Sequence, residues 1–394
     1  MKILVVCQHY WPEPYPLQDV CDEMVQRGHQ VFVVTGVPNY PLGEIYPEYR
    51  RGKNREQVVN GVRIHRCFTI GRRKNTFFRL LNYFSFAISS TLYLWRLKEQ
   101  FDVVFTNQTS PVIMSGGAVA YGRRHRKNVV LYCMDLWPAS LAAGGIEEKS
   151  PIYRAFGLLS RRIYRAADRI LITSESFRTY LQTQFQIENH KIRYHPQYAN
   201  VIAAVPDMPR HRGVNLVFTG NVGVAQSLPA VLKAAKLLEA EPMLYWHIVG
   251  DGSELERTKR LAQELCLSNV VFHGRKPQSE MSAYMAMADA LLLPLTNDPV
   301  ISMTLPGKTQ AYMASGKPII AMANGEVSRL ILESGCGFCA PAEDAEALAQ
   351  AVRAFLVCPN RECLGENGLR YYQEHFSRNR FMDVLEQELK EQAV

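Results

Sequence analysis

The residues with the most specific chemistry in this chain lie between Leu305 and Pro318, where Lys308 stands alone at the expected first turn of a helix. A helix N-terminus presents free backbone N–H groups and the positive end of a dipole, so it favours a bound anion. Lys308 adds a full positive charge at that point, and Thr309 follows it with a hydroxyl. The stretch therefore predicts a site for a diphosphate that requires no metal ion.

Two other motif matches in the chain fail on their spacing. The run 307–309 matches the end of a P-loop, but that loop needs a glycine five residues before its second glycine, and Ser302 stands there. Cys336 and Cys339 have C-x-x-C spacing, but no second pair with matching spacing completes a four-ligand zinc site. We therefore expect neither a P-loop nor a bound metal or cofactor.

Short apolar runs alternate with helix-length segments along the chain, which predicts an α/β fold with parallel sheets covered on both faces. At 394 residues the chain is long for one core, so two domains of roughly 180–200 residues are expected. The proline-containing segment 196–213 shows little periodicity and marks the boundary. We expect a first domain at 1–198, a linker at 199–213 and a second domain at 214–394, with the C-terminal helix of the second domain crossing back to the first. Two doubly wound domains would face each other across a cleft, with ligands at the carboxyl ends of the strands.

The expected elements follow this alternation. Expected strands are 2–7, 31–35, 62–67, 103–106, 129–134 and 169–173 in the first domain, and 215–219, 245–249, 270–272, 290–293 and 318–321 in the second. Expected helices include 17–27 and 77–95 in the first domain, and 228–238, 254–266, 279–288, 309–315, 326–334, 345–356 and one from about 366 onward in the second.

The net charge of +8 is concentrated in one segment. Between Arg50 and Leu80 there are ten basic residues and one acid, Glu56, while the rest of the chain is close to neutral. Such a cationic patch indicates a negatively charged partner surface, which is anionic lipid, a phosphorylated acceptor or nucleic acid.

The segment Phe77–Trp95 has the pattern of an amphipathic helix. The sixteen uncharged residues between Arg79 and Arg96 would form a helix of about 24 Å, short of the hydrocarbon thickness of about 30 Å, so it is not expected to span a membrane. Its apolar face either packs in the core or lies on a membrane surface beside the cationic patch. The residues of that face are Phe77, Leu81, Phe84, Ile88, Leu92 and Trp95.

Several short motifs follow one another along the chain, each weak alone but specific in order and spacing. They are His9–Pro14, Arg27–His29, Pro38–Pro41, Asp135–Pro138, Phe218–Gln226, Val249–Gly252, Met313–Pro318 and Cys336–Phe338. Taken together, they resemble the motifs of retaining glycosyltransferases of the GT-B fold, in glycosyltransferase family 4. The resemblance runs nearly end to end and is strongest to the bacterial branch that builds capsule, O-antigen and exopolysaccharide.

In the second domain the resemblance implies a donor site. The loop with Gly220, Asn221 and Gly223 would meet the donor's phosphates, with Gln226, Lys308 and Thr309 nearby, and Gly250 and Gly252 would lie beside the nucleotide. Arg275 would lie near the base, and Glu326 would bind the ribose. Each has a simpler alternative: tight turns for the glycines, a solvated charge for Arg275, and interaction with a helix dipole for Glu326.

In the first domain the resemblance implies that Asp135 lies near the acceptor and the reacting sugar. Its place at the carboxyl end of an inner strand favours a catalytic or acceptor-orienting role, although an aspartate there could simply cap the next segment. The resemblance assigns the acceptor to four further residues, His9, Tyr10, Asn39 and Tyr40.

The chain departs from the family pattern at two places. Many members carry two glutamates eight positions apart, and here Met303 and Ala311 occupy those positions. Donor placement would then depend on Lys308, Gln226 and backbone N–H groups. The first-domain loop after His9 usually carries a glycine pair, and here Tyr15 and Pro16 stand at that turn.

The resemblance implies a retaining transferase that moves a sugar from a nucleotide-sugar, of the UDP class, to a polyprenyl-pyrophosphate-linked saccharide. Its partners would be that donor and that acceptor, without nucleic acid. The Arg50–Leu80 region and the Phe77–Trp95 helix predict a further partner, an anionic membrane surface. Scattered cysteines and an N-terminal apolar run too short for a signal peptide favour the cytoplasm, at the inner face of the membrane. Two alternatives stay open: a sugar-nucleotide 2-epimerase of the same fold, which needs no acceptor, and a degenerate binding protein without catalysis.

Overall fold

The computed structural model describes residues 1–394 except 74–75, 144, 200–207, 209 and 242, and the chain forms two compact units. Unit 1 comprises Met1–His195 together with Met382–Val394, and unit 2 comprises Pro196–Phe381. The expected linker, 199–213, falls within unit 2, and its residues 200–207 and 209 lie outside the described residues.

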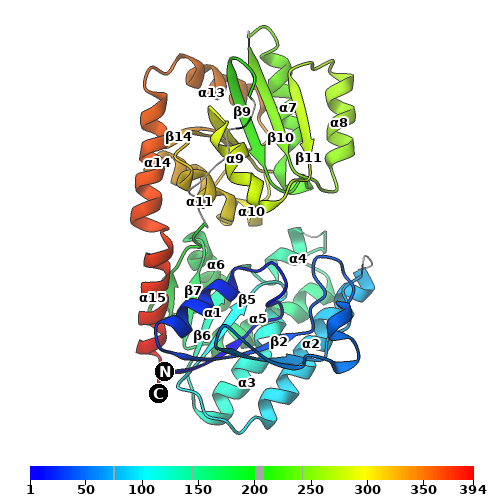
Figure 1. Cartoon of the computed structure of the whole chain (residues 1–394), viewed down its shortest axis with the longest axis vertical. Helices are drawn as coiled ribbons and strands as arrows, with labels where there is room; N and C mark the ends of the chain where they lie inside the picture. Colours follow the sequence, from blue (N-terminus) through cyan, green and yellow to red (C-terminus); the bar gives the residue numbers. More distant parts are fainter. Residues whose placement is uncertain (74–75, 144, 200–207, 209, 242) are drawn as a thin grey trace. The chain divides into compact units, whose positions relative to one another are not determined.

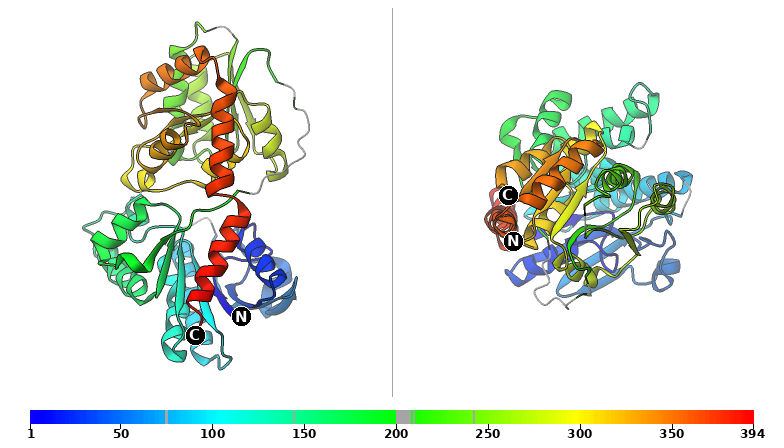
Figure 2. Two further views of the ribbon diagram at one scale, coloured as in Figure 1. Left: turned by 90° about the vertical axis from the view of Figure 1, so that its left-hand side faces the viewer. Right: turned by 90° about the horizontal axis from the view of Figure 1, so that it is seen from above.

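Unit 1 is built on a sheet of eight strands in the order β3-β4-β2-β1-β5-β6-β7-β8, with helices on its faces (Figures 1 and 2). The order reverses between β1 and β5, which places a crevice at the carboxyl ends of these two strands. The strands are β1 (Lys2–Val6), β2 (Gln30–Gly36), β3 (Glu56–Val59), β4 (Val62–Cys67), β5 (Val103–Gln108), β6 (Val129–Cys133), β7 (Arg169–Ile172) and β8 (Ile192–Tyr194). The α-helices are α1 (Leu17–Gln26), α2 (Thr76–Arg96), α3 (Gly116–His125), α4 (Ala139–Ala143), α5 (Pro151–Ala166) and α6 (Ser176–Phe185).

Unit 2 is built on a parallel sheet in the order β11-β10-β9-β12-β13-β14, which reverses between β9 and β12. The strands are β9 (Val214–Thr219), β10 (Leu244–Val249), β11 (Val270–Gly274), β12 (Ala290–Pro294), β13 (Ile319–Met322) and β14 (Gly337–Ala340). The α-helices are α7 (Leu228–Leu237), α8 (Leu255–Glu264), α9 (Met281–Ala286), α10 (Pro299–Met303), α11 (Gly307–Ala314), α12 (Glu326–Ser334), α13 (Ala345–Val357) and α14 (Arg361–His375). Alternate strand residues form two hydrophobic clusters, one with α7, α8 and α13 and the other with α9, α11 and α12.

The expected all-parallel first sheet is wrong at its edge, where β3 pairs antiparallel with β4. Asn60 and Gly61 join the two strands with φ values of +52° and +82°. A two-residue turn with positive φ at both positions matches the twist of a hairpin, and Asn-Gly is its strongest sequence signal. The Asn60-Gly61 turn signal is present in the sequence, but the charged residues before it, Arg55 and Glu56, interrupt the alternation that would have indicated strand β3.

The C-terminal segment belongs to unit 1 although unit 2 precedes it in the chain. Instead of one expected helix from about residue 366, the structure has two, α14 and then α15 (Arg378–Glu391). On α15, Glu388 lies 3.0 Å from Arg169 Nε, and both side chains are almost fully buried. The backbone N–H of Val394 donates to Asp102 O at 3.0 Å. These contacts lie at the amino ends of β5 and β7, away from the strand ends where ligands bind.

Helix α2 turns its expected apolar face away from the core of unit 1, so the core-packing alternative for that face is wrong. The buried face consists of Asn82, Phe86, Ser90 and Leu94, each 0% exposed. The opposite face is exposed, and it carries Phe77, Phe84, Ile88, Leu92 and Trp95 with 41 to 61% exposure. We call these five residues the apolar stripe. Within the described part of the chain, no helix combines the length and hydropathy that crossing a membrane requires.

Candidate functional site

Two loops at the carboxyl ends of neighbouring strands form the floor of the candidate site in unit 2. The loop after β9 begins at Gly220, and the loop after β10 begins at Gly250. Gly220 N donates to Val249 O at 2.9 Å, and Val222 N donates to Asp251 O at 2.9 Å. Gly250 has φ +146°, and a Cβ atom there would lie 1.7 Å from the carbonyl oxygen of Gly220. Only glycine allows the two loops to come this close.

The same close packing extends to the next turn of each loop. A Cβ atom on Gly252 would lie 2.3 Å from Val222 O and 2.8 Å from Asn221 Oδ1, and one on Gly223 would lie 2.5 Å from Asn221 Nδ2. These glycines are therefore needed for the tight turns themselves, because a side chain at Gly252 would clash with the neighbouring loop and one at Gly223 would clash with Asn221. It does not compete with ligand binding, since the same approach leaves an open pocket above the loops.

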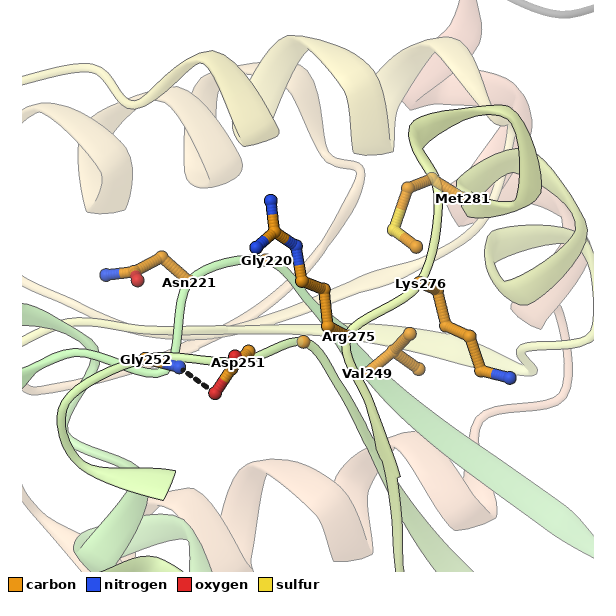
Figure 3. Close-up of a pocket in the computed structure, with 9 residues that line it drawn as sticks. Gly220, Asn221, Val249, Asp251, Gly252, Arg275, Lys276 and Met281 are labelled. Carbon is orange, nitrogen blue, oxygen red and sulfur yellow. Dashed lines mark hydrogen bonds between the residues drawn. The ribbon is translucent and has the colours of Figure 1, made fainter. Parts of the chain in front are cut away.

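That pocket has a volume of about 380 Å³ and is drawn in Figure 3. The predicted residues Gly220, Asn221, Gly250, Gly252 and Arg275 all line it. Lys276 and Met281 also line it and were not predicted, although Lys276 directly follows Arg275 in the sequence. Asp251 accepts the backbone N–H of Gly252 at 2.8 Å.

A β-bulge at the end of β11 positions the two cations of the pocket. Ile248 pairs with Phe272, but Val249 pairs with Gly274, so His273 is the extra residue of the bulge. Gly250 N then donates to Gly274 O at 2.9 Å, which holds the end of β11 against the second glycine loop. Bulges occur next to active sites because they redirect the residues that follow. Here Arg275 and Lys276 follow directly.

Lys308 is the second residue of α11, as the sequence predicts, and it lies beside the first glycine loop. Its Nζ donates to Gln226 Oε1, lies 4.4 Å from the centre of the Phe218 ring, and stands 3.3 Å from where a Cβ of Gly220 would be. Among the described residues no carboxylate forms an ion pair with it. Burial lowers the pKa of Lys308 from 10.5 to about 7. A buried amine without a counter-ion is a favourable place for an anion.

Thr309 is not among the residues that line the pocket, and its predicted role in donor binding stays a prediction. It is fully buried, and its backbone N–H donates to Pro306 O at 2.9 Å. Successive residues of an α-helix point about 100° apart, so Lys308 and Thr309 cannot both face the loop after β9.

Glu326 is the first residue of α12 and is only 2% exposed. Its Oε1 lies 2.7 Å from Arg329 Nη2. The preceding Gly325 has φ +66°, and a Cβ there would lie 2.2 Å from Ser302 O. A carboxylate in the first turn also suits the helix dipole, so contact with a ribose stays a prediction.

In unit 1 the loops after β1 and β2 are joined by one buried carboxylate, that of Glu13. Its Oε2 lies 2.8 Å from His9 Nδ1, and its Oε1 accepts the backbone N–H groups of Asn39 and Tyr40, both at 2.6 Å. The structure thus brings together three of the four predicted acceptor residues. Glu13 was not predicted, although it lies four residues after His9 in the sequence.

The aromatic ring of Tyr15 completes this cluster. It stacks on His9 with ring centres 4.9 Å apart and lies 5.5 Å from the Tyr40 ring. Tyr15 occupies a position where the resembling family carries a glycine, so an aromatic side chain fills space that would be open beside a glycine backbone. Tyr10, in contrast, does not join the predicted acceptor residues. It is 2% exposed and hydrogen-bonds Cys21 on α1, and burial raises its pKa.

Asp135 follows β6 by two residues, and two serine hydroxyls hold its carboxylate. Ser110 Oγ donates to Oδ2 and Ser140 Oγ donates to Oδ1. Ser110 also accepts the indole N–H of Trp137 at 3.0 Å. Because α4 begins only at Ala139, Asp135 is not its N-cap. The carboxylate is thus half-buried and held from both sides after the carboxyl end of β6, and its catalytic or acceptor-orienting role stays a prediction.

In the described residues no group of three or more His, Cys, Asp or Glu side chains is placed to hold a metal ion. Cys336 and Cys339 are both free. That donor binding needs no metal stays a prediction.

Two family models match the chain in sequence order. The model described as "Glycosyl transferase 4-like domain" matches residues 16–197, and the one described as "Glycosyl transferases group 1" matches residues 213–357. Together they account for most of the chain.

Curated relatives carry related names. WcaI of Escherichia coli K12, provisionally assigned as a colanic acid biosynthesis glycosyl transferase, is 26% identical in an alignment of 389 positions that covers 91% of this chain and 93% of that protein. WbjE of Pseudomonas aeruginosa, also provisionally assigned as a glycosyltransferase, is 28% identical over 236 residues, 57% of this chain and 58% of that protein. The matched part of WbjE is thus under two thirds of its length.

Solved structures share the fold. Sucrose-phosphate synthase from Thermosynechococcus elongatus aligns with a TM-score of 0.75 at 16% identity, covering 99% of this chain and 98% of that one. Anabaena Alr3699/HepE, solved in complex with UDP and glucose, aligns with a TM-score of 0.67 at 12% identity, covering 99% of both chains. With both family models matched and two parallel-sheet units of the GT-B kind, this chain belongs to the group 1 glycosyltransferases.

Proposed function

We propose that this protein is a retaining glycosyltransferase that moves a hexosyl or N-acetylhexosaminyl group from a UDP-sugar to a polyprenyl-pyrophosphate-linked saccharide. The observation that carries the proposal is the amine of Lys308, buried beside the Gly220 loop and lacking an acidic partner in the described structure. A surface polysaccharide product is supported by the name of WcaI. The UDP class is supported by the ligand named for HepE.

The chemistry requires that negative charge on the departing diphosphate be stabilised. When the bond between the sugar carbon and the β-phosphate oxygen breaks, that charge develops beside Lys308 and the N-terminus of α11. Arg275 and Lys276, which line the pocket above the glycine loops, add positive charge. Groups that are held in place before the reaction stabilise such charge without reorganisation.

The missing glutamate pair changes how the donor sugar is held. Met303 ends α10 and Ala311 lies within α11, so neither position supplies a carboxylate. Gln226, which accepts the hydrogen bond from Lys308 Nζ, is the polar side chain next to the amine. In the proposed complex Gln226 orients Lys308, and backbone N–H groups of the glycine loop hold the phosphates.

The first prediction is that Lys308→Ala weakens UDP binding roughly 10- to 100-fold, because a charge-assisted hydrogen bond is lost. Isothermal titration calorimetry without added metal measures it. Lys259→Ala is the matched control, since Lys259 is a half-exposed lysine of unit 2 paired with Glu256. Equal affinities in wild type and Lys308→Ala would contradict the diphosphate site.

The depressed pKa of Lys308, about 7, gives a second prediction. Only the charged amine attracts a diphosphate, and above pH 7 the free protein holds it mostly neutral. UDP affinity should therefore fall roughly five- to tenfold per pH unit from pH 7 to 9, and binding should take up a proton. Lys308→Arg stays charged, so its affinity should not change over this range. A flat profile for the wild type would count against Lys308 as the phosphate ligand.

Third, we propose that Asp135 acts at the acceptor or the reacting sugar. Asp135→Asn keeps the shape of the side chain, and it should lower the transfer rate roughly 100-fold or more while leaving UDP affinity unchanged. Asp168→Asn is the control, because Asp168 is bound to Val129 N at 2.8 Å at the other end of β6. A parallel loss of activity in both variants would indicate a structural role.

The product of the same assay tests the reaction class. A retaining transferase leaves the donor's anomeric configuration in the product, which NMR of the glycoside reads directly. Interconversion of the UDP-sugar without any acceptor would support the 2-epimerase alternative instead, and binding without turnover would support the degenerate one.

We also propose that the apolar stripe on α2 rests on the anionic cytoplasmic face of a membrane. Cations flank it: Arg73 lies 4.4 Å from the Phe78 ring centre, and Arg124 lies 4.8 Å from that of Trp95. Apolar side chains bordered by cations suit the boundary between acyl chains and anionic headgroups. The stripe extends towards α5, because the Phe84 and Phe156 rings are 6.2 Å apart.

The fourth prediction concerns this surface. Ile88→Ser/Leu92→Ser should reduce binding to phosphatidylglycerol-containing vesicles roughly tenfold or more, with UDP affinity unchanged. Leu237→Ser/Leu332→Ser removes two comparably exposed leucines from unit 2 and should leave vesicle binding intact. Co-sedimentation with vesicles measures binding of the two double variants. Equal partitioning of both variants into the vesicle fraction would contradict the membrane proposal. Of the ten basic residues in segment 50–80, Lys74 lies outside the described residues.

A further inference from the structure

A second pocket, of about 310 Å³, lies in unit 1 at the carboxyl ends of β2 and β4. Four of the side chains that line it are cationic, namely Arg51, Lys53, Arg55 and Arg66, and no acidic side chain lines it. An isolated concentration of positive charge without acids is unfavourable unless an anion is present. This pocket is separate from the glycine loops, which belong to unit 2.

Arg66 forms the inner wall of this pocket and is only 1% exposed. Its Nη1 donates to Asn54 O and its Nη2 to Trp11 O, both at 3.0 Å, and its guanidinium lies 4.7 Å from the Tyr49 ring centre. Its Nε is buried and has no hydrogen-bond partner among the described residues. Arginine is seldom fully buried unless it is paired.

No acid in the described structure forms an ion pair with Arg66. Burial lowers the pKa of Arg66, and the Tyr49 phenol and the buried Glu13 carboxylate oppose that shift. Glu13 already binds His9, Asn39 and Tyr40, so its oxygens are occupied. The guanidinium is therefore a buried cation that still lacks a counter-ion.

The three outer cations are exposed at the rim. No ion pair joins Arg51, Lys53 or Arg55 to an acid in the part of the chain that the structure describes. Arg55 is held in place because its Nε donates to Arg66 O at 3.3 Å and Arg66 N donates to Arg55 O at 2.9 Å. One fixed inner guanidinium and three outer cations resemble the donor set that a phosphate requires.

We infer that this pocket binds a diphosphate, and that the diphosphate is the one on the lipid-linked acceptor. The second part of the inference rests on the proposed function. Val37 and Thr69 line the pocket, and Val37 N donates to Thr69 Oγ1 at 3.3 Å. Val37 O accepts the Asn39 side-chain amide at 2.8 Å, so the pocket borders the predicted acceptor residues.

The pocket also borders the lipid-facing helix. Phe68 lines it with 59% exposure, and Phe68 O accepts the Ser89 hydroxyl of α2 at 2.7 Å. A prenyl chain leaving a diphosphate in this pocket would pass over Phe68 towards the apolar stripe. Saccharide, diphosphate and lipid would thus contact three adjoining parts of unit 1.

The test uses the 394-residue chain carrying Lys308→Ala, so that the donor site contributes little, and inorganic pyrophosphate as the probe. Adding Arg51→Gln/Lys53→Gln/Arg55→Gln should weaken pyrophosphate binding about tenfold or more by calorimetry. Lys98→Gln/Arg123→Gln/Arg126→Gln removes the same charge from exposed positions of unit 1 and should change it less than about twofold.

Arg66→Gln should abolish pyrophosphate binding, but it alters a buried residue and could unfold unit 1. The decisive comparison is therefore between the outer triple variant (Arg51→Gln/Lys53→Gln/Arg55→Gln) and the control triple variant (Lys98→Gln/Arg123→Gln/Arg126→Gln). Equal affinities in the two triple variants, or no pyrophosphate binding at all, would overturn the inference.

Two further probes identify the source of the phosphate. Farnesyl diphosphate should bind with the same sensitivity to the outer triple as pyrophosphate, and phosphatidylglycerol vesicles should bind the outer triple and the control triple alike. Loss of vesicle binding in the outer triple, with pyrophosphate binding unchanged, would assign the pocket to lipid headgroups and overturn the diphosphate assignment. Failure of UDP to bind the wild type would instead remove the proposed function, and a triple-sensitive pyrophosphate site would survive it.

Discussion

The close approach of two strand-end loops in unit 2 is the constraint on which the candidate donor site depends. Gly250 has no room for a side chain because Gly220 O occupies that space. The approach lets Val249 and Asp251 accept backbone N–H groups from the first loop, and it leaves the pocket open above them. The bulge at His273 then brings two cations to the same edge of the sheet. In this site the backbone geometry of the two loops and the bulge determines where the charged side chains can lie.

Both units place a buried cation at the carboxyl ends of their strands without an acidic partner in the described structure. In unit 2 it is Lys308, whose pKa burial lowers to about 7, and in unit 1 it is Arg66, whose Nε lacks a hydrogen-bond partner. A lysine can respond to burial by losing its proton, whereas an arginine stays charged. The two sites would therefore differ in pH dependence even if both bind diphosphates.

The sequence was informative where function depends on short segments. Lys308 at a helix start and the glycine loops could be predicted because local spacing determines them. The buried orientation of Thr309 and Tyr10 could not, because it depends on how each element is rotated against its neighbours. Glu13 was missed since its partners, Asn39 and Tyr40, come from another loop. For the same reason the pattern of α2 could reveal an apolar face but not which face the core would cover.

The placement of Met382–Val394 in unit 1 has a consequence for synthesis of the chain. Domains generally fold as they leave the ribosome, from the N-terminal end. Here all of unit 2 is made before the segment that completes unit 1. Until that segment arrives, Arg169 lacks Glu388, and Asp102 O lacks the N–H of Val394. The domain translated first is therefore the last to be finished, because its final buried ion pair forms only after all of unit 2 has been synthesised.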